Sequence, residues 1–320
     1  MDRLEAMAIL VATVEAGSFS AASRKLSVPL PTVSRKLAAL EEHLGVRLLM
    51  RSTRSLTLTE AGLTYLQSCK QILDQVTEAE RSASGEYTTP RGELVVTAPV
   101  VFGRLHLLPI INDFLASFPQ INIRLILSDK TMHLVDDHID AAVRVGRLPD
   151  SGMMATQVGT VCRVVCASPE YLASHGKPTH PNDLIEHSCV NFEGLPSGAL
   201  WTFAPAATPA NILTVMVKPR LSVNTAEAAI DAAIANVGLT HVLSYQISHA
   251  VEQQKLRLVL REFEPTPIPV HLVHAGQIPL PVKTRSFFDF VVPRLRSVLL
   301  GDKDRLRAGM NTLVPEYPDL

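Results

Sequence analysis

The hydroxyl and basic side chains between Ser18 and Arg54 have the types and spacing best suited to bind a polyanion. From Arg24 to Arg54 there are seven Lys or Arg residues and two acids, Glu41 and Glu42, so this stretch carries 7 − 2 = +5, whereas the whole chain carries −1. A local basic patch in a neutral chain has a natural partner in a nucleic acid. Basic runs are also common as solvated surface, so charge alone does not decide between the two.

The chain around this patch has the pattern of two short helices joined by a turn. Ser18 can cap a helix that continues to Leu26, and the prolines that follow would not be tolerated inside a helix. Pro31 suits the first turn of a second helix, which should end near Leu44 because Gly45 can adopt the left-handed conformation. The apolar residues of this second helix form one stripe at Val33, Leu37, Leu40 and Leu44. The pattern predicts a helix-turn-helix.

Polar residues off that stripe, and a short hairpin after it, are the candidate contacts to DNA. The segment 48–58 reads as two short strands around a turn at Ser52 and Thr53, which is typical of a wing. The start of the second helix should enter the major groove, and the wing arginines should lie on the backbone or in the minor groove. The expected DNA-binding residues are Ser18, Ser20, Thr32, Ser34, Arg35, Lys36, Arg51, Thr53 and Arg54.

These residues resemble the N-terminal signature of LysR-type transcriptional regulators. The matching motifs, in order and without a gap, are Phe19-Ser20-Ala21-Ala22, Val33-Ser34-Arg35, Leu40-Glu41-Glu42, Leu44-Gly45-Val46, Leu48-Leu49, Arg51, Arg54 and Leu58-Thr59-Glu60-Ala61-Gly62. The resemblance implies a DNA-binding regulator with a winged helix-turn-helix. One difference is Leu30, where many members of the family carry Gln or Ser. A leucine cannot donate a hydrogen bond to a phosphate or a base edge.

A long helix is expected next, from Glu60 to Ser84, with Thr59 as its cap. Apolar residues recur at alternating spacings of 3 and 4, which is a short heptad seam. The residues expected to pair two chains are Leu66, Cys69, Leu73, Val76 and Ala83. The alternative is that this stripe packs on its own domain. The family resemblance favours a linker helix in a homodimer, with further pairing into a dimer of dimers (a homotetramer) that reads an inverted repeat.

From Glu93 onward strands alternate with helices, which predicts an α/β region with a mostly parallel sheet. Strands are expected at 94–97, 121–127, 141–145, 162–167, near Val190 and Trp201, and at 215–223, 237–243 and 271–274. Helices are expected up to Phe118, at 132–137, after Ser168-Pro169, and at 225–236, 244–255 and 284–300, followed by a mobile tail after Gly301.

This region resembles the effector-binding domain of the same family, which has the two-lobed fold of type 2 periplasmic solute-binding proteins. The corresponding motifs are 139–146, Pro169-Glu170-Tyr171-Leu172, Gly238-Leu239 and Phe287-Phe288-Asp289-Phe290. The resemblance implies crossings between lobes near Cys162 and Pro267 to Pro269, with a small molecule between the lobes. The expected domains are 1–60 for DNA binding, 61–90 for the linker helix and hinge, and 91–300 for effector binding. Lobe I would comprise 91–161 and 268–300, lobe II 162–267, and the tail 301–320.

Ligands of open α/β sheets bind beyond the carboxyl ends of the strands, where helix N-termini favour anions. We therefore expect a small organic effector, with a carboxylate or other acceptor favoured. The effector-binding candidates are Ala98, Pro99, Val100, Ser128, Phe192, Glu193, Asn224 and Thr225. Each could equally be an ordinary cap or loop residue.

Motifs for catalysis are missing from the sequence. It contains no phosphate loop, no paired-glycine dinucleotide fingerprint and no zinc-binding helix motif, so we expect neither an enzyme nor a cofactor or metal. Cys162 and Cys166 would be roughly 13 Å apart in one strand, too far to form a disulfide. The apolar run 6–14 follows an acidic start, so a cytoplasmic protein without a membrane span is expected. The alternative is a solute-binding or small-molecule-metabolising α/β protein with an accessory helical domain.

Overall fold

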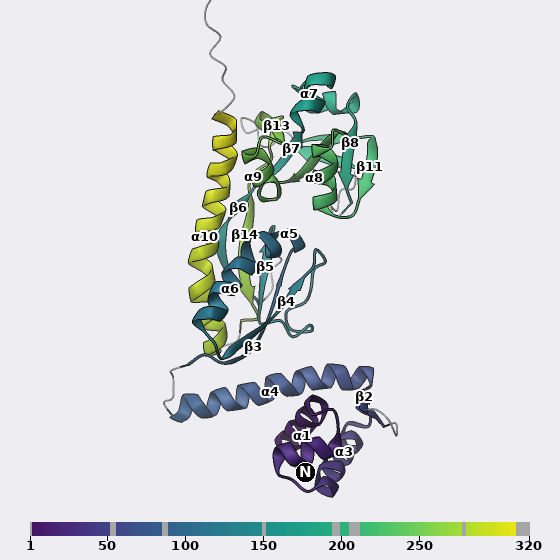
Figure 1. Ribbon diagram of the computed structural model, residues 1–320, viewed down its shortest axis with the longest axis vertical. Coiled ribbons are helices and arrows are strands. Elements are labelled where there is room, and N and C mark those ends of the chain that lie inside the picture. Colours follow the sequence, from purple (N-terminus) through teal and green to yellow (C-terminus); the bar gives the residue numbers. More distant parts are fainter. Residues whose placement is uncertain are drawn as a thin grey trace, which may run out of the picture. The chain divides into compact units, whose positions relative to one another are not determined.

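The computed structural model describes residues 2–51, 56–84, 89–148, 152–193, 199–204, 212–276 and 280–311 (Figure 1). The chain forms two compact units, Met1–Gly92 and Glu93–Leu320, which are treated separately below.

The first unit is a small helical domain with a two-stranded wing. Its elements are α1 (Arg3–Glu15), α2 (Phe19–Leu26), α3 (Leu30–Leu44), β1 (Leu49–Arg51), β2 (Leu56–Leu58) and α4 (Glu60–Ser84). As predicted, Ser18 caps α2 by accepting the N–H of Ala21 at 3.1 Å, and Gly45 ends α3 with φ at 69°. Val33, Leu37 and Leu40 are buried against Ile9 and Leu10 of α1. The winged helix-turn-helix is therefore confirmed.

The base of the wing is tied to both neighbouring helices. Glu41 of α3 accepts the backbone N–H groups of Leu48 and Leu49 at 2.8 and 3.0 Å. Thr59 caps α4 by accepting the N–H of Gly62 at 2.9 Å. A Cβ atom on Gly62 would lie 2.0 Å from the carbonyl oxygen of Leu48, so only glycine fits there. These contacts fix the direction in which the hairpin leaves the domain.

The second unit has two lobes, each built on a five-stranded sheet. In lobe I the strand order is β4-β3-β5-β14-β6, and in lobe II it is β11-β8-β12-β7-β13. The lobe I strands are β3 (Gly92–Ala98), β4 (Ile121–Leu127), β5 (Ala141–Val145), β6 (Met154–Val161) and β14 (Ile268–His274). The lobe II strands are β7 (Arg163–Ala167), β8 (Cys189–Phe192), β11 (Pro219–Val223), β12 (Leu239–Leu243) and β13 (Arg257–Val259), with a separate hairpin of β9 (Leu200–Phe203) and β10 (Leu213–Met216). The chain crosses between lobes at Cys162 and between β13 and β14, as predicted.

Helices cover these sheets and join the lobes. One continuous helical stretch in lobe I comprises α5 (Val100–Phe102), the π-helix η1 (Gly103–Leu107) and α6 (Leu108–Ser117). The others are α7 (Pro169–His175), η2 (Pro181–Ile185), α8 (Ala226–Ile234), α9 (Ser244–Glu252), η3 (Arg261–Phe263) and α10 (Val282–Asn311). One apolar cluster includes Val101 and Phe102 of lobe I together with Phe192, Ala226 and Tyr245 of lobe II, so the lobes share a core.

The sheet pattern differs from the sequence-based prediction in two ways. The sheets are mixed rather than mostly parallel, because β14 runs antiparallel to β5 and β6, and β12 and β13 run antiparallel to β7. The predicted strand 215–223 is in fact two strands, β10 and β11, and β6 and β13 were not predicted at all. The predicted helix at 132–137 is a set of turns, in which Asp137 accepts the N–H of His133 at 2.8 Å.

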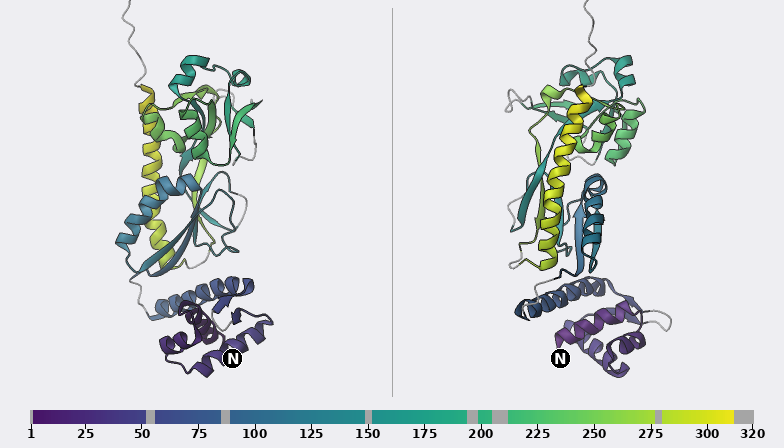
Figure 2. Two further views of the ribbon diagram at one scale, coloured as in Figure 1. Left: turned by 45° about the vertical axis from the view of Figure 1, so that its right-hand side comes forward. Right: turned by 60° about the vertical axis from the view of Figure 1, so that its left-hand side comes forward.

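Helix α10 is longer than predicted and lies along both lobes (Figure 2). It contacts α6 and β6 of lobe I and α9 of lobe II. Asp302, expected in a mobile tail, is 3% exposed. The tail prediction is therefore wrong up to Asn311, and residues 312–320 lie outside the described range.

In the described part of the chain, one helical stretch, Val100–Ser117, is long and apolar enough to span a membrane. Core helices pass the same test. Here Phe102, Leu107, Ile111 and Phe114 are buried in the core of lobe I, which accounts for the apolar composition.

Candidate functional site

The start of α3 presents part of the predicted DNA-contacting set together. Arg35 is exposed, and Thr32 and Ser34 are half-buried beside the apolar stripe. Lys36 forms an ion pair with Glu5 of α1 and is only 26% exposed at its side chain. Arg35 is therefore better placed than Lys36 to contact a ligand.

The remaining predicted DNA-contacting residues are either exposed on α2 or have side chains outside the described set. Ser18 is exposed, but its hydroxyl oxygen caps α2, and Ser20 is exposed in the first turn of that helix. Arg51 lies in β1, but its side chain is outside the described set, as are Thr53 and Arg54. The strands of the predicted wing are confirmed by the pairing of Leu49 with Leu58.

Part of the predicted dimer seam on α4 faces the domain's own core. Cys69 is fully buried there, and Leu66 packs against the same cluster. The prediction for Cys69 is wrong, because heptad spacing shows that a helix has one apolar face but not which neighbour covers that face. Leu73 and Val76 are partly exposed beyond this cluster, and the side chain of Ala83 lies outside the described set.

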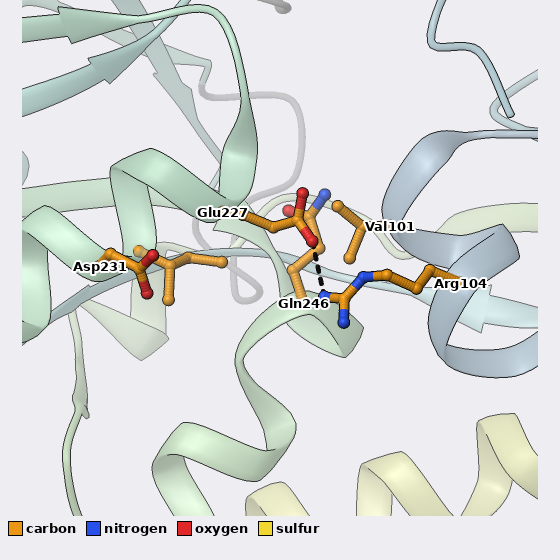
Figure 3. Close-up of a pocket in the computed structure, with 6 residues that line it drawn as sticks. Val101, Arg104, Glu227, Asp231 and Gln246 are labelled. Carbon is orange, nitrogen blue, oxygen red and sulfur yellow. Dashed lines mark ion pairs between the residues drawn. The ribbon is translucent and has the colours of Figure 1, made fainter.

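A pocket of about 460 Å³ lies between the two lobes. Val101 and Arg104 line it from lobe I, and Glu227, Ile230, Asp231 and Gln246 line it from lobe II (Figure 3). Its volume falls within the usual range for sites that bind small organic molecules. Polar and charged groups beside the apolar Val101 and Ile230 can orient such a molecule.

An ion pair crosses this pocket. The guanidinium of Arg104 lies 2.6 Å from Oε1 of Glu227, and the dashed line in Figure 3 marks this contact. The two side chains are 53% and 38% exposed. Exposed pairs contribute about 0–1 kcal/mol, so this contact between lobes can be broken at low cost.

None of the predicted effector-binding residues is among the six that line this pocket. Val100 directly precedes Val101, and Thr225 caps α8 by accepting the N–H of Ala228 at 3.3 Å. Ala98 is 1% exposed and its carbonyl accepts the N–H of Ser128, while Phe192 is buried in the shared core. Pro99 and Ser128 are half-buried, and Glu193 and Asn224 are exposed.

The start of α5 already has a negatively charged partner. Oδ1 of Asp129 accepts the N–H of Val100 at 3.1 Å. The predicted preference for an anionic ligand relied on free N–H groups at two helix starts, Pro99–Val100 and Asn224–Thr225, and at the second the Thr225 hydroxyl accepts the N–H of Ala228. With Asp129 in place, the cation available to such a ligand in the pocket is Arg104.

A second polar junction joins the lobes at α10. Oδ2 of Asp302 lies 3.1 Å from Nε2 of His106 in η1, without the alignment of a hydrogen bond, and both side chains are almost fully buried. Oδ1 of the same carboxylate accepts the hydroxyl hydrogen of Ser248 in α9 at 3.0 Å. His106 also packs edge-on against Phe102 and Tyr245. This carboxylate therefore holds elements of both lobes.

Comparisons with known proteins match both units. Residues 4–63 match the family described as bacterial regulatory helix-turn-helix protein, lysR family. Residues 88–296 match the LysR substrate binding domain, which is more than half of the chain. The chain belongs to the LysR family of transcriptional regulators.

Relatives cover nearly the whole of this LysR-type chain. An HTH-type transcriptional repressor of Pseudomonas aeruginosa is 35% identical over 294 residues, which cover 91% of this chain and 92% of the relative. The HTH-type transcriptional activator AaeR of Escherichia coli is 29% identical and covers 89% of this chain and 91% of its own length. The full-length structure of the Vibrio cholerae virulence activator AphB covers 91% of this chain and 98% of its own, with 28% identity and a TM-score of 0.58. The structure of CrgA, a LysR-type transcriptional regulator from Neisseria meningitidis, is 30% identical in sequence and also has a TM-score of 0.58. The match covers 91% of this chain and 98% of CrgA.

Membership of the LysR family confirms the predicted function class, a DNA-binding regulator with an effector-binding domain. The family consists of transcriptional regulators rather than enzymes. The alternative of a solute-binding or metabolic protein with an accessory helical domain is therefore set aside.

Sequence reasoning found the helix starts of this LysR-type regulator but not the side chains that line its pocket. Arg104 lies one turn after Val100, and Glu227 lies in the first turn after Thr225. Val100 and Arg104 are four residues apart and share one face of the helix, so the first start pointed to this neighbour. Glu227, two residues after Thr225, and Asp129, one residue after the predicted Ser128, do not follow from the predicted positions by helix spacing.

The described residues of the regulator offer little for metal or thiol chemistry. They include no group of three or more His, Cys, Asp or Glu that could hold a metal ion. Burial raises the pKa of Cys166 and Cys189 to about 12, and that of Cys69 to about 11. Thiols with such values stay protonated and unreactive near neutral pH.

Proposed function

We propose that this protein is a cytoplasmic regulator that binds double-stranded operator DNA as a homodimer or dimer of dimers and responds to a small organic effector in the pocket between its lobes. The carrying observation is the ion pair Arg104–Glu227, which crosses that pocket. A molecule bound there would act directly on the contact between the lobes.

DNA binding is assigned to the first unit. The N-terminal turns of α3 would enter the major groove with Arg35 on base edges, and the wing would lie along the backbone. Glu41 and Gly62 support this by fixing the base of the wing against α3 and α4.

Self-association is assigned in part to α4. Leu73 and Val76 are partly exposed apolar residues beyond the domain core, so they are the candidates for pairing with a second chain. A two-fold symmetric dimer reads an inverted repeat, because each protomer presents the same surface to one half-site.

The effector class follows from the charges in the pocket. A carboxylate on the ligand would compete with Glu227 for the guanidinium of Arg104. The Arg104–Glu227 ion pair that it would replace is solvent-exposed and therefore weak. Such a ligand would open the Arg104–Glu227 contact and shift the balance between lobe arrangements. The relatives include both a repressor and an activator, so they do not set the direction of regulation.

The first test is a gel shift with DNA from upstream of the protein's own gene, compared with a duplex of unrelated sequence. Preferential retardation of the upstream DNA supports the proposal, and equal affinity for both duplexes contradicts it. Thermal-shift screening of organic acids against their amides then tests the effector class, because a ligand that binds the folded state raises its Tm. Acids should raise the Tm more than their matched amides.

A further inference from the structure

Leu30, the first residue of α3, is an apolar side chain at the surface. It is 42% exposed and does not belong to the core cluster that buries Val33, Leu37 and Leu40. The start of the helix does not depend on it either, since the carbonyl of Pro29 accepts the N–H groups of Thr32 and Val33. The described fold of the unit therefore gives little reason for a leucine at this position.

The surroundings of Leu30 are polar and basic. Thr32 and Ser34 follow in the same two turns of α3, and Arg35, next to Ser34, is exposed. A surface of this kind is complementary to DNA, whose phosphates carry the negative charge. On the base edges of the major groove, the one apolar group is the 5-methyl of thymine.

Leu30 has no hydrogen-bonding group, so it cannot read a base through donors or acceptors. A methyl group is the one base feature that such a side chain can distinguish by direct contact.

We propose that Leu30 is a specificity-determining residue that contacts the 5-methyl group of a thymine in the operator half-site. This inference rests on the proposed binding of operator DNA through α3. Burying one methyl group against a leucine contributes about a fourfold gain in affinity, the equivalent of about 0.8 kcal/mol. The position would then favour thymine over cytosine even though no polar group reads it.

The test uses a duplex selected by the full-length protein from a pool of random sequences. Each thymine of one half-site is replaced in turn by uracil, which removes the methyl group and keeps the base pairing. The dissociation constant of every duplex is measured for the wild-type protein, for Leu30→Ala and for Leu4→Ala. Leu4 is the matched control, since it is a leucine of α1 with 41% exposure.

The wild-type protein and Leu4→Ala should each bind about fourfold more weakly when one particular thymine becomes uracil. Leu30→Ala should bind the thymine and uracil duplexes equally at that position. Equal sensitivity to uracil in Leu30→Ala and wild type would overturn the proposal, as would a wild-type protein indifferent to every replacement. If Leu30→Ala bound every duplex with the same affinity as wild type, Leu30 would not contact the operator and the proposal would be wrong. Failure to select any sequence from the pool would instead contradict the proposed DNA binding itself.

Discussion

Arg35 and Lys36 are adjacent basic residues with different surroundings. The side chain of Lys36 is held by Glu5, whereas Arg35 is exposed and makes no such ion pair within the described set. A planar guanidinium can also contact a guanine through two hydrogen bonds, which a lysine ammonium cannot match in geometry. The two residues should therefore contribute differently to sequence recognition.

We expect Arg35→Ala to weaken binding to the selected duplex by about 1–3 kcal/mol, the usual contribution of a bidentate base contact. Binding to an unrelated duplex should fall much less. Competition gel shifts with the two duplexes measure both values. Lys25→Ala is the control, because Lys25 of α2 is basic but pairs with Glu15 of α1 at 2.9 Å. An equal loss on both duplexes for Arg35→Ala would mean that Arg35 contacts phosphate only.

His241 is a buried residue whose protonation should limit stability in acid. It is 3% exposed, stacks on Phe203, and lies near the ring of Trp201. Burial, with a smaller contribution from the charge of Arg163, holds the pKa of His241 well below its ordinary value. The folded state therefore keeps His241 neutral, while the unfolded state takes up a proton below about pH 6.5. Stability is lost as pH falls through that value.

Replacing His241 by Phe should remove this part of the pH dependence. Relative to the variant, the wild-type protein should lose up to about 1.4 kcal/mol of stability per pH unit below pH 6.5. Trp201, the single tryptophan of the chain, lies next to the site and reports its unfolding in urea by fluorescence. His249→Phe is the control, since the His249 side chain is 75% exposed. Parallel stability curves for wild type and His241→Phe between pH 7.5 and 5.5 would refute this account.

At the scale of elements, local signals predicted the helices of the first unit well. Ser18, Pro31 and Gly45 define a cap, a first turn and a left-handed end through their own chemistry, so these boundaries need no tertiary information. The heptad stripe on α4 was identified correctly as an apolar face, but its partner was not. Cys69 is covered by α1 and the rest of its own domain, and that depends on packing that a periodic pattern does not contain.

In the second unit the sequence predicted the lobe crossings and most strands, but not their directions. The return of β14 beside β5 and β6 is a property of the whole chain path, so no local pattern in 268–274 reveals an antiparallel partner. Strands at sheet edges were missed for a different reason. Met154, Ala155 and Gln157 in β6 are all exposed, so the first half of this strand lacks the apolar alternation by which a half-buried strand is recognised.

The part of α10 after Gly301, which the sequence suggested was a mobile tail, should stabilise the fold through Asp302. Asp302 joins the buried side chains of His106 and Ser248, and it also contacts Arg305, whose side chain is 50% exposed. Asp302→Ala should lower the free energy of unfolding by about 3–5 kcal/mol, since it leaves buried polar partners without their carboxylate. Urea unfolding followed by Trp201 fluorescence measures this. Asp289→Ala, at an exposed position of the same helix, should stay within about 0.5 kcal/mol of wild type. Equal stability of the two variants would contradict the junction.

At the scale of the molecule, the shared apolar core and the pocket make opposite contributions to lobe movement. Phe102 and Tyr245 pack across the lobes with ring centroids 5.3 Å apart, so separating the lobes would expose buried apolar surface. The Arg104–Glu227 pair at the pocket is exposed and weak. A ligand can shift this balance only by its differential affinity for the two arrangements, typically about 1–3 kcal/mol of coupling.

The ion pair therefore predicts opposite effects for its two members. Glu227→Gln removes the competitor of a carboxylate ligand and should lower the concentration of an organic acid needed for half-maximal response by up to about fivefold, the equivalent of 1 kcal/mol. Arg104→Ala removes the cation that the ligand needs and should abolish the response. Both variants should retain DNA binding without ligand, because the pair lies outside the helix-turn-helix unit.

Gel shifts at increasing concentrations of an acid found by thermal shift measure the half-maximal concentration for the wild type and both variants. Asp231→Asn is the control for loss of negative charge in the same pocket. If Glu227→Gln and Asp231→Asn lowered the required concentration equally, the effect would be general electrostatics and not competition for Arg104. If Arg104→Ala responded like wild type, the effector would bind elsewhere.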